Sequence, residues 1–299
     1  MADSDTVFPD EFTQFMGQEW IGRLPARLAD CERRWTLKAG PPFPNLSYHY
    51  VAPVVRADGS AAVLKIGVPS SEFQWQIDAL RFYTGNGSVR LLEADGDAGA
   101  MLLERLEPGV LLSTLTENGE DEKATSIAAG VMRRLWRPAP PGHGFPTVAD
   151  WSQGLERLQR RFDGGTGPFP AELVEAAERL FAELIASTTD AVLLHGDVHH
   201  FNILSAERAP WLAIDPQGVV GDPAFEIGPF LQNPSPQSVE VLARRLDQLS
   251  EELDLDRERA RGWALAQGVL SAWWCMEDGV DCWVEGIDYC ERLRATTRK

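Results

Sequence analysis

The chain has 299 residues, of which 28 are basic and 45 acidic, so its formal net charge is −17 at pH 7. This charge disfavours nucleic acid and anionic membrane surfaces as partners, because both attract positively charged proteins. Hydrophobic content of 44% is ordinary for a globular protein, and no apolar run approaches the roughly 20 residues of a transmembrane helix. The N-terminus lacks the basic and apolar segments of a secretory signal. We therefore expect a cytoplasmic protein, a monomer or weak dimer, with no nucleic-acid or membrane partner.

Turn signals and apolar runs predict strands in the first third of the chain. Two apolar runs are separated by Ala57-Asp58-Gly59, a short link that favours an antiparallel hairpin. The strand pattern ends at Leu106-Glu107-Pro108-Gly109, which indicates a linker, so we place a lobe boundary near residue 106. The expected elements are strands at 48–55, 61–66, 89–92 and 100–104 and a helix at 72–84.

The remaining two thirds are mostly helical in pattern, which predicts an α+β fold with segregated strands and helices. Two short apolar stretches, 191–194 with 203–204 and 211–214, interrupt the helices and suit buried strands. We expect an N-terminal nucleotide-binding lobe, residues 1–106, and a C-terminal lobe with the catalytic loop and substrate site, residues 107–299. The expected helices are 121–136, 148–162, 171–187, 238–253 and 260 to the C-terminus.

The four cysteines, Cys31, Cys275, Cys282 and Cys290, contain no C-x-x-C pair. We expect buried free thiols rather than disulfides or zinc ligands.

Polar residues with kinase-like spacing follow the short strand at 191–194. Asp197 lies two residues after His195, Asn202 lies five after Asp197, and Asp215 ends a further apolar run. Kinases place a base and metal ligands in H-R-D-x-x-x-x-N, with an aspartate downstream. The spacing therefore predicts Asp197 as the base for a substrate hydroxyl, and Asn202 and Asp215 as Mg²⁺ ligands.

Lys65 lies in the middle of the apolar strand at 61–66. An alternating strand with its lysine in solvent would explain it, but a buried lysine needs an anion. With the downstream set of polar residues, we favour nucleotide phosphates as that anion. The following helix offers Glu72, Gln76 and Asp78 as side-chain partners, and we choose Glu72.

Two segments identify a family. Residues 194–204, LHGDVHHFNIL, and 214–218, IDPQG, resemble the aminoglycoside phosphotransferases, which implies the bilobal protein-kinase-like fold with a small β-rich N-lobe and a larger helical C-lobe. Residues 102–109, 221–226 and 271–279 resemble the branch that phosphorylates streptomycin at its 6-hydroxyl, grouped with hydroxyurea-resistance kinases. The resemblance spans about residues 35–280.

The resemblance implies ATP, or alternatively GTP, as phosphate donor with Mg²⁺. It implies Asp197 as catalytic base, Asn202 and Asp215 as metal ligands, Lys65 on the nucleotide phosphates, and Glu104 to Leu106 as the hinge that binds adenine through its backbone. The chain departs from the kinase pattern because it has no G-x-G-x-x-G. The loop AGPPFPNLS at 39–47 would have to cover the phosphates.

The acceptor is expected to be a small cationic or polar molecule with a hydroxyl group, and streptomycin is the best candidate. Hydroxyurea or an amino sugar is the alternative. Charge-assisted pairs would favour carboxylates around the hydroxyl that faces Asp197, and Trp273 with Trp274 could form a ring platform. Solvated acids and core tryptophans are the structural alternatives. The expected substrate-binding residues are Asp197, Glu226, Trp273, Glu277 and Asp278.

Two other classes of function remain open. A metallohydrolase would gather His195, His199 and His200 with Asp197 on a metal, but it leaves Asn202 and Asp215 without a role. A non-catalytic kinase-like module would bind nucleotide without turnover.

Overall fold

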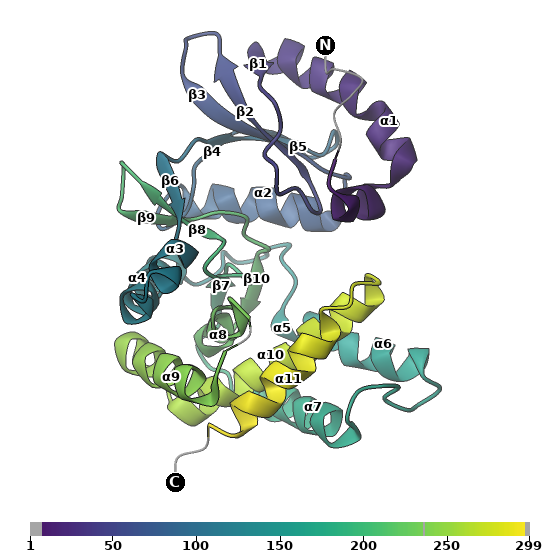
Figure 1. Ribbon diagram of the computed structural model, residues 1–299, viewed down its shortest axis with the longest axis vertical. Coiled ribbons are helices and arrows are strands. Elements are labelled where there is room, and N and C mark those ends of the chain that lie inside the picture. The colour runs from purple at the N-terminus through teal and green to yellow at the C-terminus, as the bar shows by residue number, and fades with distance from the viewer. Residues whose placement is uncertain (1–7, 236, 297–299) are drawn as a thin grey trace. The chain divides into compact units, whose positions relative to one another are not determined.

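The computed structural model describes residues 8–235 and 237–296, and the chain divides after Gly109 into two compact units, 1–109 and 110–299 (Figure 1). In the part of the chain described, no helix combines the length and the apolar character needed to cross a membrane.

Unit 1 is built on an antiparallel five-stranded sheet in the order β1-β2-β3-β5-β4. The predicted hairpin is confirmed: Arg56 N donates to Ser60 O at 2.9 Å, and Gly59 takes the positive φ of 83° that the turn requires. The strands predicted at 48–55 and 89–92 each begin two residues later than predicted, at Tyr50 and Leu91. The strands are β1 (Leu37–Ala39), β2 (Tyr50–Arg56), β3 (Ala61–Ile66), β4 (Leu91–Asp95) and β5 (Ala100–Glu104).

Two helices accompany the sheet, α1 (Asp10–Trp35) and α2 (Ser71–Tyr83) (Figure 1). α1 kinks at Gly17, where φ is 72°. Ser70 caps the N-terminus of α2, and its hydroxyl accepts from Phe73 N at 3.1 Å. The predicted helix at 72–84 is confirmed. Apolar residues of α1, such as Phe12 and Leu24, form one core with residues of the sheet, such as Ala52, Leu64 and Leu102.

Unit 2 is mainly helical, as predicted. The expected helix at 148–162 is two helices that meet at Gln153, and the expected last helix is interrupted at residues 278–282. α11 lies along α10 after this turn (Figure 1). The helices are α3 (Ser113–Glu117), α4 (Asp121–Leu135), α5 (Val148–Ser152), α6 (Gly154–Arg161), α7 (Ala171–Ala186), η1 (Pro223–Glu226), α8 (Ile227–Gln232), α9 (Val239–Leu253), α10 (Arg257–Glu277) and α11 (Trp283–Arg294).

Short strands in unit 2 place the polar residues of the motif at strand ends. β7 (Val192–Leu194) pairs with β10 (Val219–Gly221), and β8 (Ile203–Ala206) pairs with β9 (Trp211–Ala213). β6 (Pro108–Leu111) completes the order β6-β8-β9. Because β7 ends immediately before His195 and β8 begins immediately after Asn202, the two pairings fix both ends of the segment that contains Asp197.

The cysteine prediction is wrong for two of the four residues. Cys275 and Cys282 form a disulfide with a Cα–Cα distance of 5.8 Å, whereas Cys31 and Cys290 are free and buried. The pairing depends on the end of α10 after Glu277, because a continuous helix would carry residues seven apart about two turns along its axis.

Candidate active site

A buried carboxylate holds the start of the segment that connects β7 to β10. This segment, residues 195–218, includes β8 and β9 and is called here the 195–218 loop. Glu226, at the end of η1, has no exposed surface. Its Oε2 accepts from His195 N at 2.7 Å and its Oε1 accepts from Gly196 N at 2.8 Å. Burial raises the pKa of the Glu226 carboxyl to about 7. The two amides that precede Asp197 are therefore fixed by one side chain.

The His195 ring fixes the same loop from its other side. His195 Nε2 lies 2.8 Å from Ile214 O, and Nδ1 accepts from Asp197 N at 3.3 Å. Burial lowers the pKa of His195 to about 4, so the ring is neutral near pH 7. These contacts select the tautomer in which Nε2 carries the proton and donates to Ile214.

Asp197 presents a partly exposed carboxylate whose orientation is set by Asn202. Asn202 Nδ2 donates to Asp197 Oδ2 and to Asp197 O, each at 3.0 Å. His199 Nε2 lies 3.4 Å from the same carboxylate oxygen. The Asp197 side chain is 38% exposed, so it can meet a molecule from solvent while its position is held by the loop.

The oxygens of Asn202 and Asp215 suit a hard cation. The amide nitrogen of Asn202 is directed at Asp197, which leaves Oδ1 as the atom of this side chain that can ligate a metal. Ile214 N donates to Asn202 O at 2.9 Å, so the residue next to Asp215 is bonded to the other expected ligand. Asp215 has a φ of 62°, in the left-handed region. An amide and a carboxylate oxygen from adjacent segments fit Mg²⁺.

In unit 1, Lys65 is 4% exposed, which excludes the solvent-facing alternative. Its Nζ donates to Gln76 Oε1 of α2 at 2.8 Å. The choice of Glu72 was wrong: Glu72 is exposed in the first turn of α2, whereas Gln76, one turn later, is buried against the sheet.

The predicted hinge lies at the end of β5. The Glu104 side chain accepts from Arg90 N at 3.0 Å, and the Glu104 amide donates to Arg90 O at 2.9 Å. Leu106 is 9% exposed. The side chain of Glu104 is therefore directed at Arg90, the residue before β4, and an adenine contact would fall to backbone groups.

Two of the expected substrate-binding residues are core residues instead. Glu226 is bonded to the loop backbone as described, and no part of it is exposed. Trp273 is 3% exposed and packs edge-on against Phe162 and Phe169, with ring centroids 6.3 and 6.4 Å away. The Glu226 carboxylate cannot pair with an acceptor, and the Trp273 ring cannot stack on one. The prediction that these two residues bind substrate is therefore wrong.

The other two expected carboxylates lie at the end of α10. Glu277 accepts two hydrogen bonds from Arg157, from Nε at 2.8 Å and from Nη2 at 2.9 Å, and this pairing raises the pKa of Arg157. Its charge is therefore already balanced within the protein. Asp278 is exposed and caps the C-terminus of α10.

Trp151 of α5 touches the loop, although its residue type and position gave no reason to select it. Gly196 has a φ of 87°, and a Cβ there would lie 2.8 Å from the Trp151 indole. Trp151 in turn meets Trp274 edge to face, at 5.4 Å and 87°. In the sequence, Gly196 of the motif was the one indication that a side chain packs closely against the backbone before Asp197.

The histidines do not form a metal site. His195 is occupied by backbone contacts, and His200 is buried and stacked on Phe230, with ring centroids 4.1 Å apart. Burial lowers the pKa of His200 to about 3. Across residues 8–235 and 237–296, no three His, Cys, Asp or Glu side chains gather where they could hold a metal. The metallohydrolase alternative is therefore wrong in its geometry.

Residues 34–279 match the family model described as aminoglycoside/hydroxyurea antibiotic resistance kinase. The chain belongs to this family. It is 39% identical over 272 residues to a streptomycin 6-kinase of Streptomyces griseus, covering 88% of this chain and 87% of the relative. It is 40% identical over 268 residues to a hydroxyurea phosphotransferase of Kitasatospora aureofaciens, covering 88% of this chain and 76% of the relative. The resemblance inferred from the motifs is confirmed.

The fold is confirmed by a solved structure of a thermostable mutant of the aminoglycoside phosphotransferase APH(4)-Ia, in a ternary complex with ADP and hygromycin B. The two share 16% identity with a TM-score of 0.66, over 91% of this chain and 99% of that chain. A small β-rich N-terminal part and a larger helical C-terminal part are common to this kinase-like fold.

Proposed function

We propose that this kinase transfers the γ-phosphate of ATP to a hydroxyl group of streptomycin. The observation that carries the proposal is the arrangement at Asp197. Its partly exposed carboxylate accepts from Asn202, its amide donates to His195, and the two preceding amides donate to Glu226. This arrangement occurs in a chain whose relatives include a streptomycin 6-kinase at 39% identity.

Asp197 supplies the base in this reaction. Its carboxylate accepts a hydrogen bond from the acceptor hydroxyl and takes the proton as that oxygen gains the phosphoryl group, with ADP as the second product. Asn202 keeps the carboxylate oriented through Nδ2. Positioning of this kind accounts for much of the rate in phosphoryl transfer, because the reaction needs little covalent help from the protein.

Asn202 and Asp215 are the residues that would hold Mg²⁺, which supplies charge neutralisation on the phosphate oxygens when bound. Lys65 would pair with nucleotide phosphates, and the backbone of Glu104 to Leu106 would contact adenine. The hydrogen bond from Lys65 Nζ to Gln76 Oε1 holds the ammonium group in place on β3. We assign the nucleotide to residues 1–106 and the acceptor to residues 107–299, and propose a cytoplasmic monomer or weak dimer.

Hydroxyurea is the second candidate acceptor, because a hydroxyurea phosphotransferase is as similar to this chain as a streptomycin 6-kinase is. A screen of acceptor-dependent ADP release over streptomycin, other aminoglycosides, hydroxyurea, amino sugars and choline separates the candidates. The expected result is fastest release with streptomycin. ADP release with none of these acceptors refutes the proposed function.

The same assay tests the base. Asp197→Ala should lower kcat by at least ~10²-fold while nucleotide affinity stays intact, because general-base contributions are of that size. Asp190→Ala is the matched control, since Asp190 is an exposed carboxylate just before β7. Equal turnover by the Asp197→Ala and wild-type proteins removes Asp197 from the mechanism.

A further inference from the structure

We propose that Trp151 and Trp274, called here the indole corner, bind the cationic group of the acceptor, and that Trp274 determines specificity for cationic over neutral acceptors. The inference rests on the proposed function and names the chemistry that this site recognises, a guanidinium or ammonium group near the reacting hydroxyl.

The first step places the Trp151 ring beside Gly196, the residue before the proposed base Asp197. A Cβ on Gly196 would lie 2.8 Å from the far edge of the Trp151 indole, 3.1 Å from Val219 and 3.2 Å from Gln217. Only glycine leaves space for the indole at this position. Since Gly196 directly precedes Asp197, the Trp151 ring lies beside the backbone that carries the proposed base.

The second step places Trp274 against Trp151. α6 begins at Gly154, where a Cβ would lie 2.5 Å from Leu270, 3.4 Å from the Trp274 indole nitrogen and 3.5 Å from Nη2 of Arg157, the guanidinium that pairs with Glu277. This glycine lets α6 approach α10 closely enough for Trp274 to reach Trp151. The two rings meet at 87° with centroids 5.4 Å apart. In a perpendicular pair, the ring that presents its edge keeps its own faces for other contacts.

The third step concerns what the exposed parts of the two rings attract; Trp151 also packs on Phe225, with ring centroids 6.0 Å apart at 60°. Both indoles are partly exposed, and an indole face attracts cations, with guanidinium able to stack on it as well. Exposed carboxylates follow Trp274 in the turn after α10, at Asp278 and Asp281. Because Arg157 already balances Glu277, the rings rather than that carboxylate are suited to select the cation.

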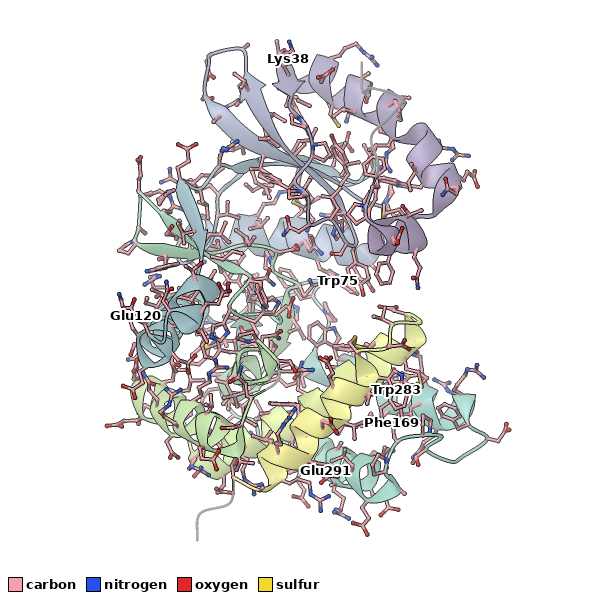
Figure 2. The ribbon with its side chains drawn as sticks, in the orientation of Figure 1. Lys38, Trp75, Glu120, Phe169, Trp283 and Glu291 are labelled. Carbon is pink, nitrogen blue, oxygen red and sulfur yellow. A yellow bond between two sulfur atoms is a disulfide. The ribbon has the colours of Figure 1, made fainter. Side chains whose placement is uncertain are left out.

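The other tryptophans near α10 do not meet these conditions. Trp273 points into the core against Phe162 and Phe169. Trp283, at the start of α11, is partly exposed like Trp274 but packs on Phe169, with centroids 5.7 Å apart (Figure 2). Trp283 is therefore a matched control: it is an indole of similar exposure in the same unit, packed on Phe169 rather than on Trp151.

The test compares Trp274→Leu, Trp274→Phe and Trp283→Leu with wild type. Streptomycin binding is measured by calorimetry, and kcat and KM are measured by ADP release with streptomycin and with hydroxyurea, which is uncharged. Trp274→Leu should raise the Kd and KM for streptomycin about twofold to thirtyfold, the range of cation–π contacts. Its kcat should stay unchanged, because the contact is equal in ground and transition states. Trp274→Phe should recover most of the affinity, and Trp283→Leu should match wild type.

Each outcome separates the inference from the proposed function. If wild type and Trp274→Leu turn over streptomycin with the same KM, the inference fails and the proposed function stands. If streptomycin binds with the expected Trp274 dependence but ADP is not released, the reaction fails and the indole corner stands. An equal rise in KM for hydroxyurea overturns the preference for a cation, and wild-type protein that neither binds nor phosphorylates streptomycin overturns both.

Discussion

The 195–218 loop and the turn between α10 and α11 hold their polar groups by opposite means. In the loop, the backbone is fixed by buried side chains, with Glu226 on two amides and His195 between Asp197 and Ile214. At the turn, the contacts are at the surface: Arg157 is 44% exposed and Glu277 28%. A disulfide supplies the fixed point there.

This difference separates the requirements of chemistry from those of recognition. A base and metal ligands must stay in place for every acceptor, and buried hydrogen bonds achieve this because breaking them leaves unsatisfied groups. Surface pairs are weak and exchange readily with solvent. The comparison therefore predicts that changes at the loop are costly for any substrate, whereas changes at the turn are mild and depend on the acceptor.

The largest effect is expected at Asn202, the proposed metal ligand. Asn202→Ala should raise the Mg²⁺ concentration needed for half-maximal activity by ~10²-fold or more, because even the residues behind metal ligands cost 10- to 100-fold when removed. Activity measured across a Mg²⁺ titration tests this, with the exposed Asn118→Ala as control. An unchanged Mg²⁺ requirement would remove Asn202 from the metal site.

The next largest effect concerns Glu226. Glu226→Leu should lower the free energy of unfolding by about 2–6 kcal/mol, because two buried amides lose their acceptor at about 1–3 kcal/mol each. At the turn, Arg157→Ala should cost less than about 1 kcal/mol, as expected for an ion pair whose side chains are 44% and 28% exposed. Urea unfolding of both variants tests the comparison directly. Similar losses of unfolding free energy in the two variants would contradict the difference proposed between the loop and the turn.

Glu226 should also make stability depend on pH. Its pKa is about 7 in the fold against an ordinary value of 4.5, so the folded state binds the proton more tightly. This contribution is fully present below pH 4.5 and is lost as pH rises through 7, by up to about 3 kcal/mol. The difference in unfolding free energy between wild type and Glu226→Gln should fall by that amount from pH 4.5 to 8. Glu285→Gln, which removes one exposed carboxylate, is the control. A Glu226→Gln curve parallel to that of wild type would contradict the shifted pKa.

The disulfide at the turn should have a smaller effect. Replacing both Cys275 and Cys282 with serine should lower the free energy of unfolding by about 2.5 kcal/mol, the loop-closure value for a ring of about eight residues. A dithiol reductant should produce the same loss in wild type and no further loss in the double variant. Identical stability of the oxidised wild type and the double variant would show that the bond does not stabilise the fold.

Local patterns in the sequence predicted the parts of the site that are contiguous in the chain. The Ala57-Asp58-Gly59 turn placed Lys65 on β3, and the apolar runs at 191–194, 203–204 and 211–214 placed Asp197, Asn202 and Asp215 in the segments between short strands. Gln76 was not chosen because an acid was assumed for Lys65, whereas helix phase decided the contact.

Other features depended on packing between elements far apart in the chain. Glu226 was assigned to substrate binding because its backbone partners, His195 and Gly196, lie 31 and 30 residues away in the chain. Trp151 was hidden inside a predicted helix, and its contact with the loop follows from how α5 packs on Gly196. The disulfide could be predicted only from the point at which α10 ends, which the continuous helical pattern concealed.

The two free cysteines make the units distinguishable in solution. Cys31 lies buried in α1 of unit 1, and Cys290 lies buried in α11 of unit 2. Burial raises the pKa of each thiol, and the thiolate is the form that alkylating reagents attack. Modification of either residue therefore requires local opening. A time course of alkylation, resolved by peptide mass, would report the opening of each unit separately within one molecule and without an added probe.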